Sequence, residues 1–308
     1  MEKTAKVLVT GHRGLAGSAV VRALQRSGYH NLLLRTHAEL DLIDQRAVAE
    51  LFQREKPEYV FHIAAKMGGI WAAMTESAEF IYENLMMQSN VMHSSYIHGV
   101  KKLLFVGSTS IFPRACPQPI REEYLLSGPM EPSNESYAIA KIAGIEMCQA
   151  YDKQYGTRFI TALATNLYGP NDNYDITRTH VFAAMIRKFH DAVKQGQADV
   201  SLWGTGTPRR EFLHADDFAD ACLFLMDNYD DPSIVNIGTG EDISIRDLAE
   251  KIRTAAGHTG NVTWDPNRPD GMPRKWLDVS KLHALGWTHQ IHLDEGIRST
   301  LDWFSEQS

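Results

Sequence analysis

The chain has 308 residues, of which 44% are hydrophobic and 22% are charged. This composition is typical of a folded globular protein, not of a disordered or fibrous one, and the length suits one large domain or two. The 31 Lys and Arg residues against 38 Asp and Glu residues leave a net charge of −7. That balance argues against a surface built to hold nucleic acid or anionic lipid.

Cysteine use and hydropathy exclude further classes. Cys116, Cys148 and Cys222 lie far apart without CxxC spacing, so we expect neither a disulfide framework nor a zinc site. No stretch approaches 18 consecutive apolar residues, and residues 1–6 carry charges where a signal peptide needs an apolar run. We therefore expect no bound metal, no membrane partner and a cytoplasmic location.

Short apolar runs alternate with segments of helical periodicity through the first half of the chain. A helix is expected at residues 15–27, and Asp44 is the expected N-cap of the next one. Because each crossover helix returns the chain in the same direction, such alternation predicts an α/β fold with a doubly wound parallel (Rossmann) sheet. The expected strands are residues 5–10, 32–34, 59–63, 103–106 and 159–164.

The pattern loosens after residue 170 into polar turns and separate helices, which predicts a smaller C-terminal α/β lobe. We expect residues 1–169, with part of 210–240, to form the sheet domain, and 170–209 and 241–308 to form the substrate-binding lobe. The Pro/Gly-rich stretches 204–208 and 265–273 are ligand-facing loops or solvated connections. Helices are expected at residues 180–195, 217–228 and 244–256.

A glycine-rich loop follows the first expected strand. Gly11, Gly14 and Gly17 have the spacing GxxGxxG and open a helix. Such glycines permit a tight turn, let backbone N–H groups approach a pyrophosphate, and allow the helix to pack closely on the strand. At this place in an alternating chain the pattern predicts dinucleotide binding, with Arg13, Leu15 and Ala16 part of the binding loop.

The end of the second strand predicts which nicotinamide dinucleotide binds. Enzymes that select NAD usually have Asp or Glu there, whereas this chain has Arg35, followed by Thr36 and His37. A cation at this position suits the 2′-phosphate of NADP, and Arg13 can reach the same place. NADP is therefore the expected cofactor; the alternative is that Arg35 is only a solvated strand-end residue.

Tyr137 and Lys141 lie four residues apart at the start of an expected helix, so they share one helical face. A tyrosine, with an ordinary pKa of about 10, transfers protons near neutral pH only if a neighbouring cation stabilises its phenolate. Lys141 is that cation. Ser108 follows the fourth strand, at the sheet edge where ligands of open α/β sheets bind, and its hydroxyl could hold a carbonyl oxygen.

These motifs together resemble the extended short-chain dehydrogenases/reductases that act on nucleotide sugars, and most closely the GDP-L-fucose synthases. The resemblance covers nearly the whole chain in order. It implies reduction of GDP-4-keto-6-deoxy-D-mannose by NADPH after epimerisation at C3 and C5. The segments that carry it are residues 11–14 (GHRG), 64–70 (AAKMGGI), 137–141 (YAIAK), 165–170 (TNLYGP) and 270–275 (DGMPRK).

The resemblance also assigns roles to single residues. It gives carbonyl binding to Ser108, proton donation to Tyr137 and contact with the cofactor ribose to Lys141, with Asn84 in support. The cofactor site implied in this way includes Asp41, Leu42, Ala64, Ala65 and Lys66, beside the glycine loop, Arg35 and His37. The implied GDP-sugar site includes Asn166, His180, Arg187, Lys188, Trp203, Arg210 and Arg274.

The sequence departs from this family at Ser110. The family's usual acid–base pair for epimerisation is a cysteine two residues after the catalytic serine and a histidine, here His180. Because an alkyl hydroxyl is a far weaker acid than a thiol, Ser110 is a poor base unless another group activates it. Three explanations stay open: an engineered Cys→Ser variant, a natural synthase in which His180 and water carry the proton, or a sister 4-reductase with little or no epimerisation. A 4,6-dehydratase is disfavoured, since those enzymes carry acidic residues where Thr109 and Ser110 stand.

Two further expectations concern partners. A non-enzymatic NADP-sensing regulator is the alternative from another class, and the retained Ser108, Tyr137 and Lys141 argue against it. By analogy with the fold family, we expect a homodimer formed through helices at residues 77–99 and 136–155. The apolar residues proposed for that surface are Phe80, Ile81, Ile145 and Met147.

Overall fold

A parallel sheet of six strands lies at the centre of the molecule. The computed structural model describes residues 1–176, 179–268 and 270–307, apart from the side chains at 70 and 71. The strand order is β10-β5-β4-β3-β1-β2. The order reverses at β1, so the carboxyl ends of β1 and β3 border a crevice where such sheets bind ligands. The strands are β1 (Val7–Thr10), β2 (Leu32–Leu33), β3 (Tyr59–His62), β4 (Lys102–Ser108), β5 (Phe159–Ala164) and β10 (Val235–Ile237). The predicted doubly wound sheet is confirmed.

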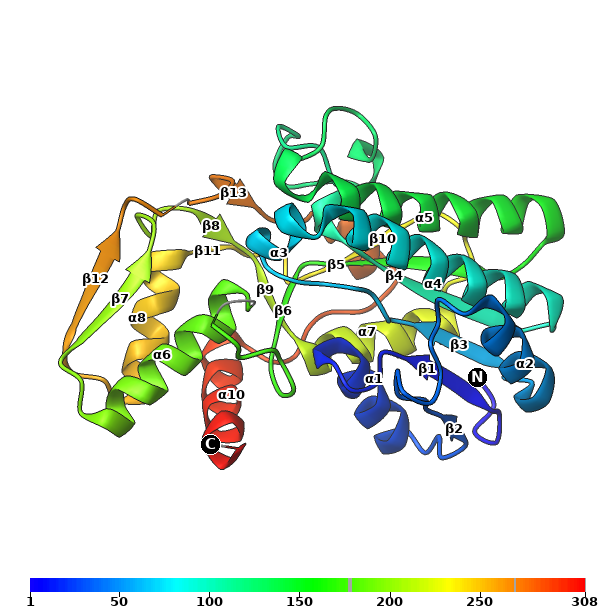
Figure 1. Ribbon diagram of the computed structural model, residues 1–308, viewed down its shortest axis with the longest axis horizontal. Helices are drawn as coiled ribbons and strands as arrows, with labels where there is room; N and C mark the ends of the chain where they lie inside the picture. Colours follow the sequence, from blue (N-terminus) through cyan, green and yellow to red (C-terminus); the bar gives the residue numbers. More distant parts are fainter. Residues whose placement is uncertain (177–178, 269, 308) are drawn as a thin grey trace.

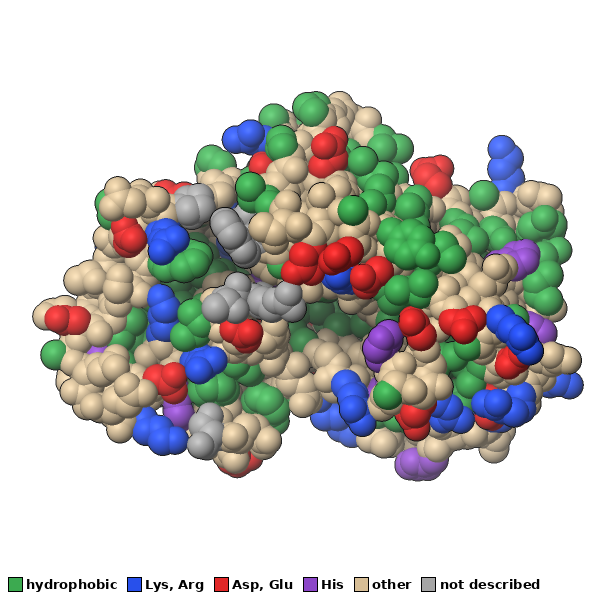
Figure 2. All heavy atoms as spheres, in the orientation of Figure 1, with side chains coloured by type: hydrophobic (Ala, Val, Ile, Leu, Met, Phe, Trp, Pro, Cys, Tyr) green, Lys and Arg blue, Asp and Glu red, His purple; other side chains and the backbone are tan. Residues whose placement is uncertain are grey.

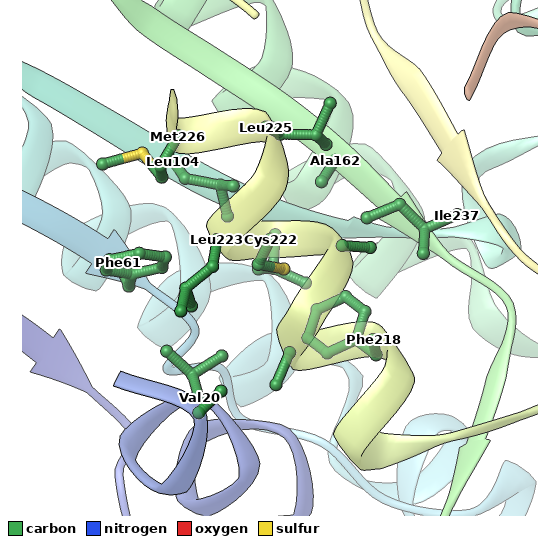
Figure 3. Packing of buried hydrophobic residues seen from close by; sticks show 14 of the residues in the cluster. Val20, Phe61, Leu104, Ala162, Phe218, Cys222, Leu223, Leu225, Met226 and Ile237 are labelled. Atoms are coloured by element: carbon green, nitrogen blue, oxygen red, sulfur yellow. The ribbon is translucent and has the colours of Figure 1, made fainter. Parts of the chain in front are cut away.

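Helices cover both faces of the sheet. On one face α1 (Leu15–Arg26) and α7 (Ala215–Asn228) pack together, and Val20, Phe218 and Cys222 lie among the strand residues Phe61, Leu104 and Ala162 (Figure 3). On the other face lie α2 (Gln45–Glu55), α4 (Ser77–Ile97) and α5 (Glu135–Tyr155). The short α3 (Ile70–Thr75) precedes α4, and α9 (Ser280–Ala284) lies beside β10. None of the described helices is long and apolar enough to cross a membrane.

Local sequence signals set the ends of several helices. The Asp44 carboxylate accepts hydrogen bonds from the backbone N–H groups of Arg46 and Ala47, at 2.9 and 3.0 Å, so it is the N-cap of α2 as expected. The helix ends at Lys56, which has a left-handed backbone. Short 3₁₀ turns lie at Thr109–Ile111, Glu122–Tyr124 and Pro132–Asn134.

The C-terminal part of the chain builds a separate lobe beside the sheet (Figure 1). The helices α6 (Val181–Gln195), α8 (Ile245–Ala256) and α10 (Leu293–Gln307) pack around one apolar cluster with the strand pair β7 (Asp199–Trp203) and β12 (Asn261–Asp265). The lobe also contains β8 (Arg209–Arg210), β11 (Ile243–Ser244) and β13 (Arg274–Lys275), which form a small three-stranded sheet.

Two features connect the lobe to the central sheet. The strands β6 (Asn166–Tyr168) and β9 (Phe212–His214) pair directly after β5 and β8. Between β8 and β9, the buried Glu211 carboxylate accepts hydrogen bonds from the N–H groups of Thr239, Gly240 and Leu277, at 2.6, 2.8 and 2.9 Å. A side chain at Gly238 would collide with this carboxylate, which explains the glycine there. The lobe is therefore fixed to the end of β10, and the molecular surface is hollowed between the two parts (Figure 2).

Candidate active site

The loop between β1 and α1 leaves the first turn of α1 open. Gly11 has φ +71°, and a Cβ there would lie 3.0 Å from the backbone of Ala64. A Cβ on Gly17 would collide with the backbone carbonyl of Gly11, whereas a Cβ on Gly14 would come no closer than 3.7 Å to the same oxygen. The start of α1 beside Gly14 is therefore open, which fits a pyrophosphate bound by the first N–H groups of the helix.

The loop after β3 is held beside this glycine loop by one hydroxyl. Thr10 Oγ1 accepts hydrogen bonds from the N–H groups of Ile63 and Ala64, both at 3.1 Å, and lies 2.9 Å from His62 Nδ1. Farther along, Asn84 Oδ1 accepts a hydrogen bond from the N–H of Lys66 at 3.0 Å, and its amide donates to the Lys66 carbonyl. The backbone of residues 63–66 is thus fixed along the crevice.

Three carboxylates surround the Lys66 side chain. Its ammonium lies 2.9 Å from a carboxylate oxygen of Glu79, 3.0 Å from Glu83 and 3.4 Å from Glu76. These carboxylates raise the pKa of Lys66 above its ordinary value. The lysine side chain therefore ties the loop to the start of α4.

The two arginines expected near a 2′-phosphate differ in their surroundings. Arg35 donates to the Leu34 carbonyl at 2.9 Å and lies 3.4 Å from Glu55. Arg13 is exposed, and no hydrogen bond from its guanidinium to another described residue is present. Both charges act on the nearby Glu39 carboxyl, whose pKa is lowered mainly by hydrogen bonds from Thr36. Arg13 is therefore the more available of the two cations.

The other residues expected in this region lie on the loop after β2. His37 is largely exposed, 3.9 Å from the Asp41 carboxylate. Asp41 accepts a hydrogen bond from the N–H of Ile43 at 2.9 Å, and the carbonyl of Leu42 accepts one from Asn90 at 2.9 Å. This loop is thereby held beside α4, within the sheet domain.

Ser108, Tyr137 and Lys141 meet at the carboxyl end of β4. Ser108 is the last residue of that strand, and its hydroxyl lies near enough to the Tyr137 hydroxyl to affect the pKa of that phenol. The Tyr137 ring is buried, with the Phe80 ring edge-to-face against it at 6.4 Å between the ring centres and Ala72 in the same apolar cluster. Burial raises the pKa of Tyr137 above its ordinary value, and the bond to Ser108 partly offsets this rise. Tyr137 is therefore a neutral phenol, able to donate a proton.

Lys141 lies buried on the same helix one turn after Tyr137, and its expected effect on the phenol stays a prediction. Its buried ammonium donates to the Val106 carbonyl at 2.9 Å and lies 4.6 Å from the centre of the Phe105 ring. Burial lowers the pKa of Lys141 to about 7. Burial and the Lys141 charge lower the pKa of the neighbouring His62 to about 3, so this histidine is neutral. Lys141 is therefore a buried lysine that can lose its proton near neutral pH.

Ser110 stands directly beside Ser108 on the 3₁₀ turn. The Ser108 hydroxyl donates to Ser110 Oγ at 3.3 Å and accepts a hydrogen bond from the Ser110 N–H at 3.3 Å. No titratable side chain bonds to Ser110 within the described residues. Nothing in its surroundings activates the hydroxyl as a base, so proton transfer needs other groups.

His180, Lys275 and Arg210 lie near enough to one another in the lobe for their charges to interact. His180 is exposed to solvent at the N-terminus of α6, yet desolvation by surrounding protein lowers its pKa, and the charge of Lys275 lowers it further. Desolvation and the nearby Arg210 lower the pKa of Lys275 to about 7. Lys275 lies opposite Arg210 in the β13–β8 pair.

The other residues expected to hold substrate are spread over the lobe. Asn166 donates to the Glu211 carbonyl at 2.8 Å and is partly buried. Arg187 donates to the Tyr174 carbonyl, and Lys188 to the Ser201 carbonyl. The exposed Arg274 is paired with Asp242, so its guanidinium is already engaged.

Lys275 and Asp172 are two candidate groups that sequence reasoning did not single out. Lys275 is part of the DGMPRK segment, but its position beside Arg210 depends on pairing between β8 and β13, which are distant in sequence. Asp172 follows the TNLYGP segment, and desolvation raises the pKa of its partly buried carboxyl to about 7. Neither feature is visible without the fold.

Comparison with known proteins gives consistent relatives. The model of the NAD dependent epimerase/dehydratase family matches residues 7–238. GDP-L-fucose synthase 1 of Arabidopsis thaliana is 54% identical over 303 residues, which are 98% of this chain and 94% of that protein. Among solved structures, a GDP-mannoheptose C4 reductase from Campylobacter jejuni with NADP bound is 41% identical, with a TM-score of 0.92 over 99% of both chains. A GDP-L-fucose synthetase from Naegleria fowleri bound to NADP is 30% identical, with a TM-score of 0.92, and covers 100% of this chain and 96% of that one.

Proposed function

The chain belongs to the NAD-dependent epimerase/dehydratase family and, within it, to the GDP-L-fucose synthases; from this premise we propose its reaction and the residues that carry it. The enzyme converts GDP-4-keto-6-deoxy-D-mannose to GDP-L-fucose by epimerisation at C3 and C5 and reduction of the C4 ketone by NADPH. The observation that carries this proposal is the meeting of Ser108 and the neutral phenol of Tyr137 at the carboxyl end of β4.

The cofactor is NADP(H), and the structure contains a place that fits it. The backbone of residues 11–17 would hold the pyrophosphate, because the space at Gly14 is open and lined by N–H groups. Arg13 would hold the 2′-phosphate, and the backbone of residues 63–66 would lie along the dinucleotide. When bound, NADPH supplies the hydride that reduces the ketone.

Reduction requires a proton at the C4 oxygen, and Tyr137 is placed to supply it. Its raised pKa keeps the hydroxyl protonated at neutral pH, and the neighbouring Ser108 hydroxyl would bind the same carbonyl oxygen of the substrate. Lys141 lies one helical turn later with a pKa of about 7, so it can return a proton toward Tyr137 after donation. The three residues together bind and protonate one carbonyl oxygen.

Epimerisation requires groups that remove and return protons at carbons next to the ketone. Those protons are acidic because the carbonyl-binding hydroxyls of Ser108 and Tyr137 stabilise the enolate. His180 is the base, since its lowered pKa keeps the imidazole neutral near pH 7. Lys275 is the second exchanging group, because a lysine with a pKa of about 7 is present in both protonation states.

A second candidate reaction is compatible with Ser110. Without a thiol at this position, a sister enzyme would reduce the 4-keto GDP-sugar with little or no epimerisation, as the likeness to a GDP-mannoheptose C4 reductase also suggests. The synthases at about 50% identity favour the epimerase/reductase. The two reactions differ in product stereochemistry and in exchange at C3 and C5.

NADPH oxidation with the 4-keto GDP-sugar tests the proposal, and Tyr137→Phe tests the named proton donor. The variant should lose nearly all turnover while GDP-sugar binding stays within about twofold, because only the hydroxyl is removed. If the variant retains a tenth or more of normal turnover, Tyr137 is not the donor. If the wild-type protein consumes no NADPH with this substrate, the proposed reaction is wrong.

We further propose that the protein forms a homodimer and acts in the cytoplasm. The surface of α4 and α5 has exposed apolar side chains, among them Tyr82, Ile97, Ile139 and Tyr155. Phe80 and Ile145, which the sequence suggested for this surface, are buried inside the subunit because their helix faces pack inward. Ile139→Asp should shift the mass measured by light scattering from dimer to monomer. The free thiols Cys116, Cys148 and Cys222 fit a reducing compartment.

A further inference from the structure

The Thr10 hydroxyl uses all of its hydrogen-bonding capacity on three partners. Its oxygen accepts the N–H groups of Ile63 and Ala64, both at 3.1 Å, and makes no other hydrogen bond within the described residues except the one to His62. A hydroxyl oxygen has two lone pairs, so these two N–H groups leave only its own hydrogen to donate. His62 Nδ1, at 2.9 Å, is therefore the acceptor of that hydrogen, and the proton of the imidazole lies on Nε2.

Packing holds the His62 ring in this orientation. The residue is fully buried, and its ring stacks on that of Phe105 with 5.8 Å between the ring centres and 21° between the planes. The Lys141 ammonium lies 4.6 Å from the centre of the same Phe105 ring. Burial and the Lys141 charge lower the pKa of His62 to about 3, so the ring stays neutral and Nδ1 stays free to accept.

The other nitrogen of His62 indicates that the residue is not optimal for stability. Nε2 is buried and has no hydrogen-bond partner within the described residues. A buried N–H without a partner lowers the free energy of unfolding. A leucine at this position has no polar atoms and would avoid that cost. The bond from Thr10 to His62 therefore points to a role other than stability.

That bond fixes the direction of the Thr10 lone pairs, which hold the loop after β3. A Cβ on Gly11 would lie 3.0 Å from the backbone of Ala64, so this loop touches the glycine loop. Both loops follow strands, β1 and β3, whose carboxyl ends border the crevice of the sheet. Without an acceptor at residue 62, the buried hydroxyl would pair its hydrogen only by turning, and its lone pairs would then leave the two N–H groups.

We propose that His62 is a positioning residue for the cofactor: by accepting the Thr10 hydrogen, it holds the backbone of residues 63–64 in the place where NADPH lies along it. This inference rests on the proposed function. Because His62 is fully buried, it touches neither cofactor nor substrate and acts only through Thr10. Its replacement should change the binding of NADPH and leave the chemical step intact.

Asparagine and leucine at position 62 form a matched pair, because their side chains have nearly the same shape. His62→Asn keeps an acceptor, since the Oδ1 of asparagine is bonded to Cγ just as Nδ1 is in histidine. His62→Leu has a methyl group there. The measurements on the full-length protein are fluorescence titration with NADPH, calorimetric binding of GDP, steady-state kinetics with the 4-keto GDP-sugar, and unfolding in urea.

We expect His62→Leu to bind NADPH about threefold to tenfold more weakly than His62→Asn, the range that corresponds to one neutral hydrogen bond. It should do so although it is the more stable variant in urea, because it buries no amide. Its kcat at saturating NADPH and its affinity for GDP should stay within about twofold of those of His62→Asn. A merely structural residue would make NADPH affinity follow stability instead.

Equal NADPH affinity of the two variants, or weaker binding by His62→Asn, would overturn the inference and leave the proposed function intact. A second comparison needs no asparagine variant. In a Thr10→Val background, which lacks the donated hydrogen, His62→Leu should cause no further loss of affinity, and additive losses would also overturn the inference. A wild-type protein that does not bind NADPH would overturn both the inference and the proposed function.

Discussion

Alanine at either of two glycines at the start of α1 should weaken cofactor binding, but only one of the two substitutions should also lower stability. An alanine at Gly17 would place a Cβ in collision with the Gly11 backbone, which cannot move without opening the loop. Overpacking against rigid backbone costs about 3 kcal/mol or more, which lowers the melting temperature by about 6 °C in a chain of this size. Gly17→Ala should therefore lose both stability and cofactor affinity.

Gly14→Ala should lose cofactor affinity alone. Its backbone, φ −80° and ψ 173°, suits alanine, and the new Cβ has no neighbour closer than 3.7 Å. Alanine is a slightly poorer N-cap than glycine, which lowers the free energy of unfolding, but it also makes the unfolded chain less flexible, which raises it. The two effects cancel to within about 1 kcal/mol. The methyl group occupies the space of the pyrophosphate. Loss of one charge-assisted hydrogen bond to the cofactor would weaken the binding free energy by about 1.5–3 kcal/mol.

Fluorescence titration with NADPH and thermal unfolding of both variants provide the measurements. Gly14→Ala should bind NADPH at least about tenfold more weakly than the wild type, with its melting temperature within about 2 °C. If Gly14→Ala binds NADPH like the wild type, the cradle at the start of α1 does not hold the cofactor.

Three more predictions follow from single residues. Arg13→Ala should raise the Michaelis constant for NADPH more than that for NADH. It should also raise the constant for NADPH more than Arg35→Ala does, because Glu55 already engages Arg35. Equal effects of Arg13→Ala on both cofactors would argue against the 2′-phosphate contact. Ser110→Cys should increase deuterium incorporation at C3 or C5 by about tenfold or more, since a thiol is a far better acid–base group; unchanged exchange in a wild type that already makes GDP-L-fucose at full speed would contradict this. Because burial lowers the pKa of Lys141 to about 7, the unfolded chain binds more protons between this pH and about 10.5, so the free energy of unfolding rises with pH in that window. Urea titrations should find this rise smaller in Lys141→Met, and an equal rise would mean that Lys141 is not buried as a titrating group.

Local patterns predicted the sheet domain well, because its signals lie close together in sequence. The apolar runs of the strands, the Asp44 cap and the glycine loop each involve neighbouring residues, and all of them appear in the structure. The short strands of the lobe were not predicted, since two-residue strands such as β8 and β13 carry too few residues for a period. Helix α10 was also missed.

The surroundings of each side chain were harder to predict than its place in the chain. Neither the three glutamates around the Lys66 ammonium nor the carbonyl that Lys141 bonds could be predicted from the sequence. The role assigned to each lysine stays a prediction. Lys275 lies opposite Arg210 in a pair of strands, and Arg268 lies over the Trp203 ring. Both contacts join segments that are distant in sequence. Such contacts depend on the folded chain.

NMR of the sugar product formed from GDP-4-keto-6-deoxy-D-mannose and NADPH in deuterated water tests the central claim most directly. It reports proton exchange at C3 and C5 and reduction at C4 in one sample. The account predicts GDP-L-fucose with deuterium at C3 and C5 and with protium at C4. A product reduced at C4 that keeps the original configuration, with protium at C3 and C5, would contradict the epimerase activity and identify a 4-reductase.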